Sequence, residues 1–378
     1  MTMTSKDRVL MVLGHERPDR PLLDLGGSFV TTINVAAYAR LRETLGLPAT
    51  WRLLREQTQS VVVDQDVREM LGVDVIGIYE RAPLPDQERV HPERTLVSEW
   101  GVTYRQADSF GAPYTLVQHP LTSATLDNLE KYPFPDPLNP ARFAGLAQEA
   151  NALRNSPYAI VGNLGWTEIF GVAWYLRGFE AFMIDLVANK EMAHALLRRV
   201  TDYQKARYAR FLDLVGDVID VILYADDMGG QDGLFISPRT YREMIKPYHV
   251  EILQHIRAHT RARLMFHSCG SIVPLLDDFI EMGMDILNPV QVAAQGMNTA
   301  MLKARYGKRI SFWGAIDTQR VLPFGSPEDV HAEVQRRVND LGGDGGYVVA
   351  PVHVVQADVP AENIIAVSHA VKNFIDAR

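Results

Sequence analysis

Residues 263–270, Arg-Leu-Met-Phe-His-Ser-Cys-Gly, hold the pattern that decides the fold. An apolar run typical of a buried strand ends there in polar residues and a glycine. Side chains alternate along a strand, so His267 and Cys269 point the same way. Seven further apolar runs end in a similar manner. The eight predicted strands are Pro21–Gly27, Val73–Tyr79, Ala159–Trp166, Val218–Met228, Arg263–Cys269, Asp285–Gln291, Ile310–Asp317 and Tyr347–His353.

Amphipathic stretches alternate with these runs and predict helices between them. Two have clear start signals, because Ser237-Pro238 and Ser326-Pro327 place serine at the N-cap and proline in the first turn. Repeated strand–helix alternation indicates a parallel sheet, and eight such units favour a closed barrel. The predicted helices are Arg142–Asn155, Glu168–Asn189, Glu191–Leu214, Pro238–His259, Ser271–Met282, Met297–Tyr306, Pro327–Leu341 and Ala361–Ala377.

Residues 88–121 interrupt this alternation. The stretches Thr95–Trp100, Val102–Gln106 and Tyr114–Gln118 have the composition of short antiparallel strands. We therefore predict an α/β fold, a (β/α)8 TIM-type barrel that occupies residues 1–378 as a single domain. The small antiparallel β insertion lies within it.

The composition is that of an ordinary globular protein, with 378 residues of which 47% are hydrophobic and 22% charged. A net charge of −8 and the lack of a basic stripe disfavour nucleic acid as a partner. No run approaches the roughly 18 apolar residues of a membrane span, and none resembles a signal peptide. The single cysteine excludes an internal disulfide. We expect no membrane association and a cytoplasmic location.

Active sites of such barrels lie at the carboxyl ends of the strands. His267 and Cys269 provide an imidazole and a thiolate on one face, which is half of a zinc site. His353 ends another predicted strand and is placed to supply a third ligand. The alternative interpretation is a buried cysteine beside a core histidine, since free cysteine is among the most buried residue types.

Three acidic residues at strand ends are candidate catalytic groups. Asp226 and Asp227 follow one apolar run, and strand alternation allows only one of them to face the barrel interior. The sequence does not decide which. Asp24 lies near the end of the first predicted strand. Each could act on substrate or orient a ligand, and each could instead cap a turn or a helix.

Further polar and aromatic residues at strand ends are candidates for substrate binding. Packing against a loop is the alternative role for a tryptophan there, and helix capping is the alternative for an aspartate. Glu168 is expected instead to be a first-turn acid that interacts with the helix dipole. The substrate-binding candidates are Asn163, Trp166, Gln291, Trp313, Asp317 and Gln319.

Several stretches resemble the uroporphyrinogen decarboxylase-like superfamily, and specifically its methyltransferase branch. They are Ile236–Pro247, Phe266–Ser271, Asn288–Gln291, Trp313–Gln319 and Ala350–His353. The resemblance implies an (α/β)8 barrel with one active site at its mouth. Decarboxylases of the superfamily carry an Arg-Gln-Ala-Gly-Arg loop that grips substrate carboxylates. The matching segment here, Leu-Asp-Leu-Gly-Gly-Ser at 23–28, has no arginine, which argues against porphyrin decarboxylation.

Methylcobamide:thiol methyltransferases of the superfamily bind zinc through a His-x-Cys pair and a later cysteine. His267 and Cys269 match the pair, while His353 stands in the place of the later cysteine. A His2Cys set is more neutral and leaves zinc a stronger Lewis acid, better suited to polarising an oxygen. The chain lacks Asp-x-His-x-x-Gly, the mark of a corrinoid-binding domain. The resemblance therefore implies that the corrinoid arrives on a separate protein.

We expect a zinc-dependent methyltransferase that moves a methyl group between a small substrate, a methyl ether or a thiol, and the cobalamin of a separate corrinoid protein. A homodimer is compatible with the sequence. One alternative is a metal-free carboxy-lyase of the uroporphyrinogen decarboxylase type, with Asp24 or one of the aspartate pair stabilising a protonated pyrrole-like ring. The other is a non-catalytic sensor that holds a metal or ligand on the same barrel.

Overall fold

The computed structural model describes residues 3–82, 90–91 and 93–374. Within these residues, seven strands form a central sheet in the order β13-β12-β11-β10-β9-β8-β3, and every pairing in it is parallel. The strands lie within the predicted bounds of the last seven strands. They are β3 (Val75–Tyr79), β8 (Ala159–Asn163), β9 (Val221–Ala225), β10 (Arg263–His267), β11 (Ile286–Asn288), β12 (Ser311–Ile316) and β13 (Tyr347–Pro351).

The segment around Leu23 connects the two ends of the curled sheet. Leu23 forms a single parallel bridge with Val349 of β13. On its other side, the Asp74 backbone amide donates to the Leu23 carbonyl at 2.8 Å. The Leu23 amide donates to the Asp74 carboxylate at 3.0 Å, where a neighbouring strand would offer a carbonyl. The fold is of the predicted TIM type. The prediction of a first strand at Pro21–Gly27 is wrong, because this segment forms only one bridge, to Val349, and bonds to the Asp74 side chain on its other side.

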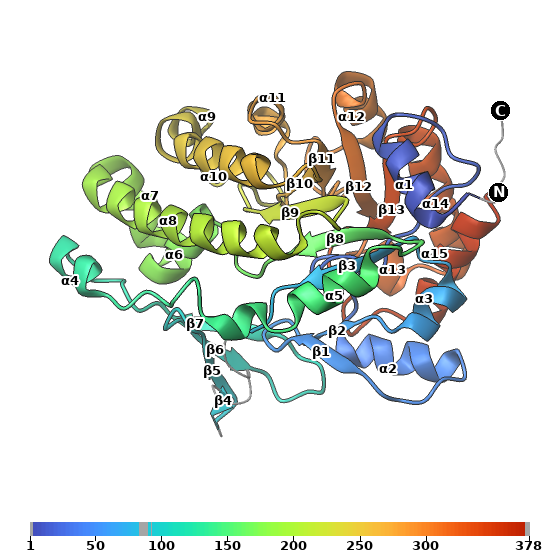
Figure 1. Ribbon diagram of the computed structural model, residues 1–378, viewed down its shortest axis with the longest axis horizontal. Coiled ribbons are helices and arrows are strands. Elements are labelled where there is room, and N and C mark those ends of the chain that lie inside the picture. Colours follow the sequence, from blue (N-terminus) through green and yellow to red (C-terminus); the bar gives the residue numbers. More distant parts are fainter. Residues whose placement is uncertain (1–2, 83–89, 92, 375–378) are drawn as a thin grey trace.

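Helices surround this sheet (Figure 1). The predicted helix Glu168–Asn189 is divided at Gly178, whose φ of 91° favours glycine. The predicted helix Ala361–Ala377 is observed to Lys372, and its last three predicted residues lie outside the described ones. The helices are α1 (Ser5–Leu13), α2 (Val35–Thr44), α3 (Gln65–Leu71), α4 (Leu126–Lys131), η2 (Pro140–Phe143), α5 (Leu146–Leu153), α6 (Phe170–Arg177), α7 (Phe179–Ala188), α8 (Lys190–Val215), α9 (Pro238–Thr240), η3 (Tyr241–Ile245), α10 (Lys246–His259), η4 (Val273–Leu275), α11 (Leu276–Glu281), α12 (Thr299–Tyr306), α13 (Val321–Phe324), α14 (Pro327–Leu341) and α15 (Ala361–Lys372).

The antiparallel insertion is present as predicted, although residues 88–89 at its start lie outside the described part. Its sheet has the order β4-β5-β6-β7. In Figure 1 this sheet projects away from the barrel, on the side opposite α11 and α12. A separate two-stranded sheet, β1-β2, was not predicted. These strands are β1 (Arg52–Arg55), β2 (Ser60–Val62), β4 (Val90–His91), β5 (Thr95–Val97), β6 (Thr103–Gln106) and β7 (Tyr114–Gln118).

The apolar core is continuous between the strands and the surrounding helices. Strands β8, β9, β12 and β13 are buried along their whole lengths, as expected for parallel strands covered on both faces. Phe266 of β10 stacks on Phe279 of α11, with ring centroids 4.5 Å apart. Among the described helices, none combines the length and the apolar character needed to cross a membrane.

Candidate metal centre and substrate pocket

Three predicted metal ligands converge at the mouth of the barrel. His267 is the last residue of β10, Cys269 follows two residues later, and His353 follows β13. One ligand atom from each lies within 4.8 Å of the other two. The Cys269 Sγ is 3.4 Å from the His267 Nε2, and the two imidazole centroids are 5.8 Å apart. Parallel strands place these side chains together because their carboxyl ends meet at one edge of the sheet.

Asn288 fixes the orientation of His267. The two residues are register partners on β10 and β11. The Asn288 amide nitrogen donates to the Trp313 carbonyl at 3.0 Å, so its oxygen faces His267. His267 Nδ1 then donates to that oxygen at 2.5 Å, which leaves the Nε2 lone pair directed at the metal position. Asn288 was not among the predicted site residues, although its place at a strand end beside His267 was a usable signal.

The surroundings favour neutral forms of the two remaining ligands. Burial, helped by His267 and Arg55, lowers the pKa of His353 to about 3, so its imidazole is unprotonated at neutral pH. Burial and the Asp227 carboxylate hold the pKa of the Cys269 thiol well above its ordinary range. A bound cation would reverse this second effect, because a coordinating thiol is deprotonated by its metal.

The donor set fits zinc. Two imidazoles and one thiolate make three protein ligands, the number found in catalytic zinc sites that keep an open position. A tetrahedral zinc with bonds of about 2.0–2.3 Å separates its ligand atoms by roughly 3.3–3.8 Å. The 3.4 Å between Cys269 and His267 lies in this range, whereas the 4.8 Å that bounds the whole group of three is longer, so His353 would move towards a bound zinc.

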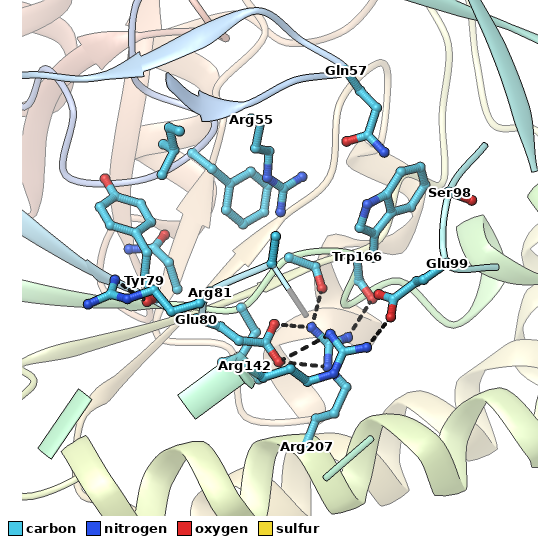
Figure 2. Close-up of a pocket in the computed structure, with 16 residues that line it drawn as sticks. Arg55, Gln57, Tyr79, Glu80, Arg81, Ser98, Glu99, Arg142, Trp166 and Arg207 are labelled. Atoms are coloured by element: carbon cyan, nitrogen blue, oxygen red, sulfur yellow. Dashed lines mark hydrogen bonds and ion pairs between the residues drawn. The ribbon is translucent and has the colours of Figure 1, made fainter. Parts of the chain in front are cut away.

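The candidate metal centre opens onto a pocket of about 880 Å³, which we call the aromatic pocket. Both ligand histidines line it, together with Asp227 and Glu168. An adjoining pocket of about 640 Å³ shares four lining residues with it, including Arg55 and Trp166 (Figure 2). The aromatic side chains that line the aromatic pocket are Phe29, Tyr104, Tyr114, Trp166 and Tyr175.

The structure separates the two adjacent aspartates. Asp227 lines the aromatic pocket, accepts a hydrogen bond from the Cys269 amide at 2.7 Å and lies 3.8 Å from the His267 Nε2. Asp226 is fully buried and turned away. Its carboxylate accepts backbone hydrogen bonds of 2.7–2.9 Å from residues 169–171 at the start of α6. His249 also donates to it at 2.9 Å. This position makes Asp226 the anion at a helix N-terminus.

We expect Asp226→Ala to lower the free energy of unfolding by about 3–5 kcal/mol, because it leaves buried backbone amides and His249 without an acceptor. Asp227→Ala is the matched control, since this side chain is half exposed. It should change stability by less than about 1 kcal/mol. Urea unfolding of both variants measures the difference. Equal effects of the two substitutions would contradict the assignment of Asp226 as the cap.

Asp24 and Trp313 contact one another inside the barrel. The Trp313 indole donates to the Asp24 carboxylate at 2.7 Å, and both side chains are fully buried. Burial raises the pKa of Asp24 to about 6. Neither residue is among those that line the aromatic pocket. Asn163 lines the adjoining pocket with its Oδ1 lacking a partner, and Trp166 lines both pockets.

The three other substrate-binding candidates lie on loops beyond the strands. Gln291 accepts from the Gly270 amide at 2.7 Å and donates to Gln231 at 2.6 Å. Gln231 in turn donates to Gln319 at 2.9 Å. Asp317 accepts from the Gln319 amide at 2.7 Å, which is a local turn contact. None of the three lines the aromatic pocket, so their proposed substrate contacts have no support from this arrangement.

Gly270 allows these loops to approach closely. Its φ is +90°, and a Cβ there would lie 2.4 Å from the carbonyl carbon of Gly229. Only glycine fits this approach without displacing backbone. The loop that carries Cys269 therefore packs directly on the loop after β9, which carries Asp227.

A network of buried ion pairs supports the pocket from below (Figure 2). Arg207 of α8 donates through its Nε and Nη2 to the two carboxylate oxygens of Glu80. Arg142 lies beside it, pairs with Glu99 and is 3.7 Å from Glu80. Arg207 also donates to the carbonyls of Gly165 and Trp166, at 2.6 and 3.3 Å. The network thereby links the insertion, the end of β3 and the loop after β8.

Comparison with known proteins places this geometry in a family. Residues 101–374 match the family model described as Uroporphyrinogen decarboxylase (URO-D). A uroporphyrinogen decarboxylase of Pseudoalteromonas atlantica is 23% identical over 362 residues, which covers 90% of this chain and 94% of that protein. The solved structure of a methyltransferase from Methanosarcina mazei has a TM-score of 0.69 and 20% identity, and the match covers 99% of both chains. At this identity the structural likeness shows a shared fold.

The family match covers most of the chain, from the insertion to the end of α15. It includes six of the seven barrel strands and all three candidate metal ligands. The protein belongs to the uroporphyrinogen decarboxylase (URO-D) family.

Proposed function

We propose that this protein is a zinc-dependent methyltransferase that transfers a methyl group between a small organic substrate and a corrinoid carried by a separate protein. The observation that carries the proposal is the convergence of His267, Cys269 and His353 at the barrel mouth, with ligand atoms within 4.8 Å of one another. The related fold of the Methanosarcina mazei methyltransferase supports this choice within the family.

One group of residues would bind the metal, and the residues of the aromatic pocket would bind the substrate. His267, Cys269 and His353 would bind zinc, which supplies Lewis acidity towards a substrate heteroatom. Asn288 keeps the Nε2 of His267 available through its 2.5 Å hydrogen bond to Nδ1. The aromatic pocket beside the ligands would enclose the organic part of the substrate. Two neutral imidazoles and one thiolate favour a methyl ether over a thiol, because less ligand charge leaves zinc more electrophilic.

Decarboxylation is the second candidate function, and the curated relative named uroporphyrinogen decarboxylase favours it. Porphyrin substrates with several carboxylates need cationic partners. Three arginines of the adjoining pocket already bind carboxylates: Arg142 and Arg207 bind Glu99 and Glu80, and Arg81 binds Glu149. Arg55 lines both pockets, but it supplies one positive charge for several substrate carboxylates. The segment 23–28 adds no arginine. We therefore expect no turnover of uroporphyrinogen.

Methyl transfer can be followed by the visible absorption of a corrinoid. Zinc-loaded protein is mixed with a cobalt(I) corrinoid and a panel of methyl ethers, methylamines and thioethers, with thiols as acceptors in the reverse direction. We expect at least one methyl ether to methylate the corrinoid with zinc-loaded protein, and no reaction with metal-free protein.

The Cys269→Ser variant serves as the negative control in the same assay. Uroporphyrinogen is tested in parallel for conversion to coproporphyrinogen. If no donor or acceptor exchanges methyl with any corrinoid while uroporphyrinogen is converted, decarboxylation replaces methyl transfer as the function. Zinc binding without either turnover would favour the non-catalytic sensor.

A further inference from the structure

Two buried polar atoms in the aromatic pocket have no hydrogen-bond partner. They are the Oε2 of Glu168 and the hydroxyl of Tyr104. Both residues line the pocket that also contains the ligand histidines. Buried polar atoms in folded proteins are nearly always paired, so each exception calls for an explanation. Two exceptions facing one pocket indicate a place where a ligand completes the hydrogen bonding.

The fold gives the Oε2 of Glu168 no hydrogen-bond partner. Glu168 lies just before α6, where an acid usually interacts with the first free amides of a helix. Asp226 already accepts hydrogen bonds from the amides of residues 169–171. Arg207 holds the preceding carbonyls of Gly165 and Trp166 from the other side. The loop is thus fixed from both sides by other residues, while the Oε2 of Glu168 stays without a partner in the pocket.

Burial favours the uncharged forms of both the Glu168 carboxyl and the Tyr104 hydroxyl. Burial, with Asp226 and Asp227 adding to it and Arg55 opposing it, raises the pKa of Glu168 to about 7. Burial, with Tyr175 and Glu168 adding to it, raises the pKa of Tyr104 far above its ordinary value. A carboxyl of this kind can donate or accept a hydrogen bond near neutral pH, and the Tyr104 hydroxyl stays protonated.

The surrounding walls are flat and aromatic. The Trp166 and Tyr175 rings meet edge to face with centroids 5.1 Å apart. The Tyr104 ring lies 6.0 Å from Trp166, and the Arg55 guanidinium lies 3.9 Å from the Phe29 ring. Aromatic rings pack well in such surroundings. A hydroxyl on a ligand ring can donate to one of the two unpartnered groups and accept from the other.

A cationic ligand fits this pocket poorly. Aromatic walls with one carboxylate can recognise an ammonium group. However, Arg55 lines the same pocket, where its guanidinium lies on the Phe29 ring and already supplies a positive charge. The pocket therefore already disfavours additional positive charge, and a neutral ligand is preferred.

We propose that Glu168 and Tyr104 bind a hydroxyl group on an aromatic ring of the substrate. The ring then lies among Trp166, Tyr175 and Phe29. The ring and its hydroxyl are inferred from the pocket alone, whereas the methyl group rests on the proposed function. Together they make the substrate class a phenolic methyl ether.

The test is isothermal titration of the metal-free protein with 2-methoxyphenol, with methoxybenzene as the analogue that lacks the hydroxyl. We expect at least tenfold tighter binding of 2-methoxyphenol, because unpaired polar groups in a site reject a ligand that cannot pair them. Glu168→Leu and Tyr104→Phe should each weaken 2-methoxyphenol binding by about tenfold and remove the preference.

Tyr306→Phe is the matched control, because Tyr306 of α12 also has a buried hydroxyl without a partner but does not line the pocket. The Tyr306→Phe variant should bind 2-methoxyphenol as tightly as the wild type does. Equal binding of the two ring compounds, or binding of trimethylammonium as tight as that of 2-methoxyphenol, would overturn the proposal. Because corrinoid and zinc are absent from this titration, its outcome is independent of methyl transfer.

Thermal stability provides a second readout that separates binding from a structural role. An acid whose pKa is raised from 4.5 to about 7 by folding is most stabilising when protonated, so its contribution falls as pH rises from about 4.5 to about 7. Glu168→Leu should therefore raise the melting temperature, and by more at pH 8 than at pH 5. A helix-stabilising acid would give a lower melting temperature on substitution, and that result would also overturn the proposal.

Discussion

Replacement of Cys269 by serine, or of His353 by alanine, is expected to lower zinc affinity by roughly a hundredfold to a thousandfold and to abolish methyl transfer. Structural zinc binding in small peptides is worth about 10–16 kcal/mol over four ligands, so one ligand contributes several kcal/mol. The fold should persist, because both side chains lie at the mouth and are only partly buried. Elemental analysis and competition with a chromophoric chelator give the zinc content and affinity.

The single cysteine allows a further measurement on the wild-type protein. Cys269 is the only thiol in the chain, so a thiol reagent reports on this position alone. Zinc should slow its reaction, and a chelator should restore it. His331→Ala is the control variant, since this exposed histidine of α14 lies outside the ligand group. Retention of one zinc per chain in the Cys269→Ser variant, with full activity, would exclude Cys269 as a ligand.

Arg207→Met is expected to lower the free energy of unfolding by about 3–5 kcal/mol. The substitution leaves the Glu80 carboxylate buried with a weaker partner, since Arg142 is 3.7 Å away. The exposed fractions of the Arg207 and Glu80 side chains are only 1% and 3%, so solvent cannot replace the lost guanidinium. The Gly165 carbonyl loses this donor as well, whereas the Trp166 carbonyl still accepts from Gln204. Urea unfolding measures this change.

A double variant distinguishes the electrostatic cause from lost packing. Adding Glu80→Gln to Arg207→Met removes the buried charge, so part of the lost stability should return. Lys131→Met is the matched control, because it removes an exposed ion pair with Asp127 in α4. It should cost less than about 0.5 kcal/mol. A double variant that is less stable than Arg207→Met alone would show that packing, and not charge, causes the loss.

Seven of the eight predicted barrel strands are confirmed, because each buried strand is a nearly continuous apolar run that ends at polar residues. The sequence could not predict the reduction of Pro21–Gly27 to one bridge. That outcome depends on the Asp74 side chain, which is far away in sequence and takes the place of a backbone partner for Leu23. The helix Glu168–Asn189 was predicted as one element because Gly178 alone does not reveal its positive φ.

The candidate site was also predicted where local sequence patterns decide it, and missed where contacts between distant segments decide it. Strand ends predicted His267, Cys269 and His353, since the position of a parallel strand fixes where its last residues lie. The sequence could not predict which way Asp226 points, or that the Oε2 of Glu168 has no hydrogen-bond partner. The two are linked, because both acids lie next to the first amides of α6. Asp226 accepts hydrogen bonds from the first amides of α6, and the Oε2 of Glu168 is left without a partner. Tyr104 was missed because its position depends on how the insertion folds onto the barrel.

The insertion has a consequence for how such proteins diversify. Tyr104 and Tyr114 reach the aromatic pocket from β6 and β7, whereas the three candidate metal ligands follow barrel strands. A substitution in the insertion can therefore reshape the pocket without touching a candidate metal ligand. An exchange of residues 95–118 between relatives is expected to change the walls of the aromatic pocket and to leave the three candidate metal ligands in place.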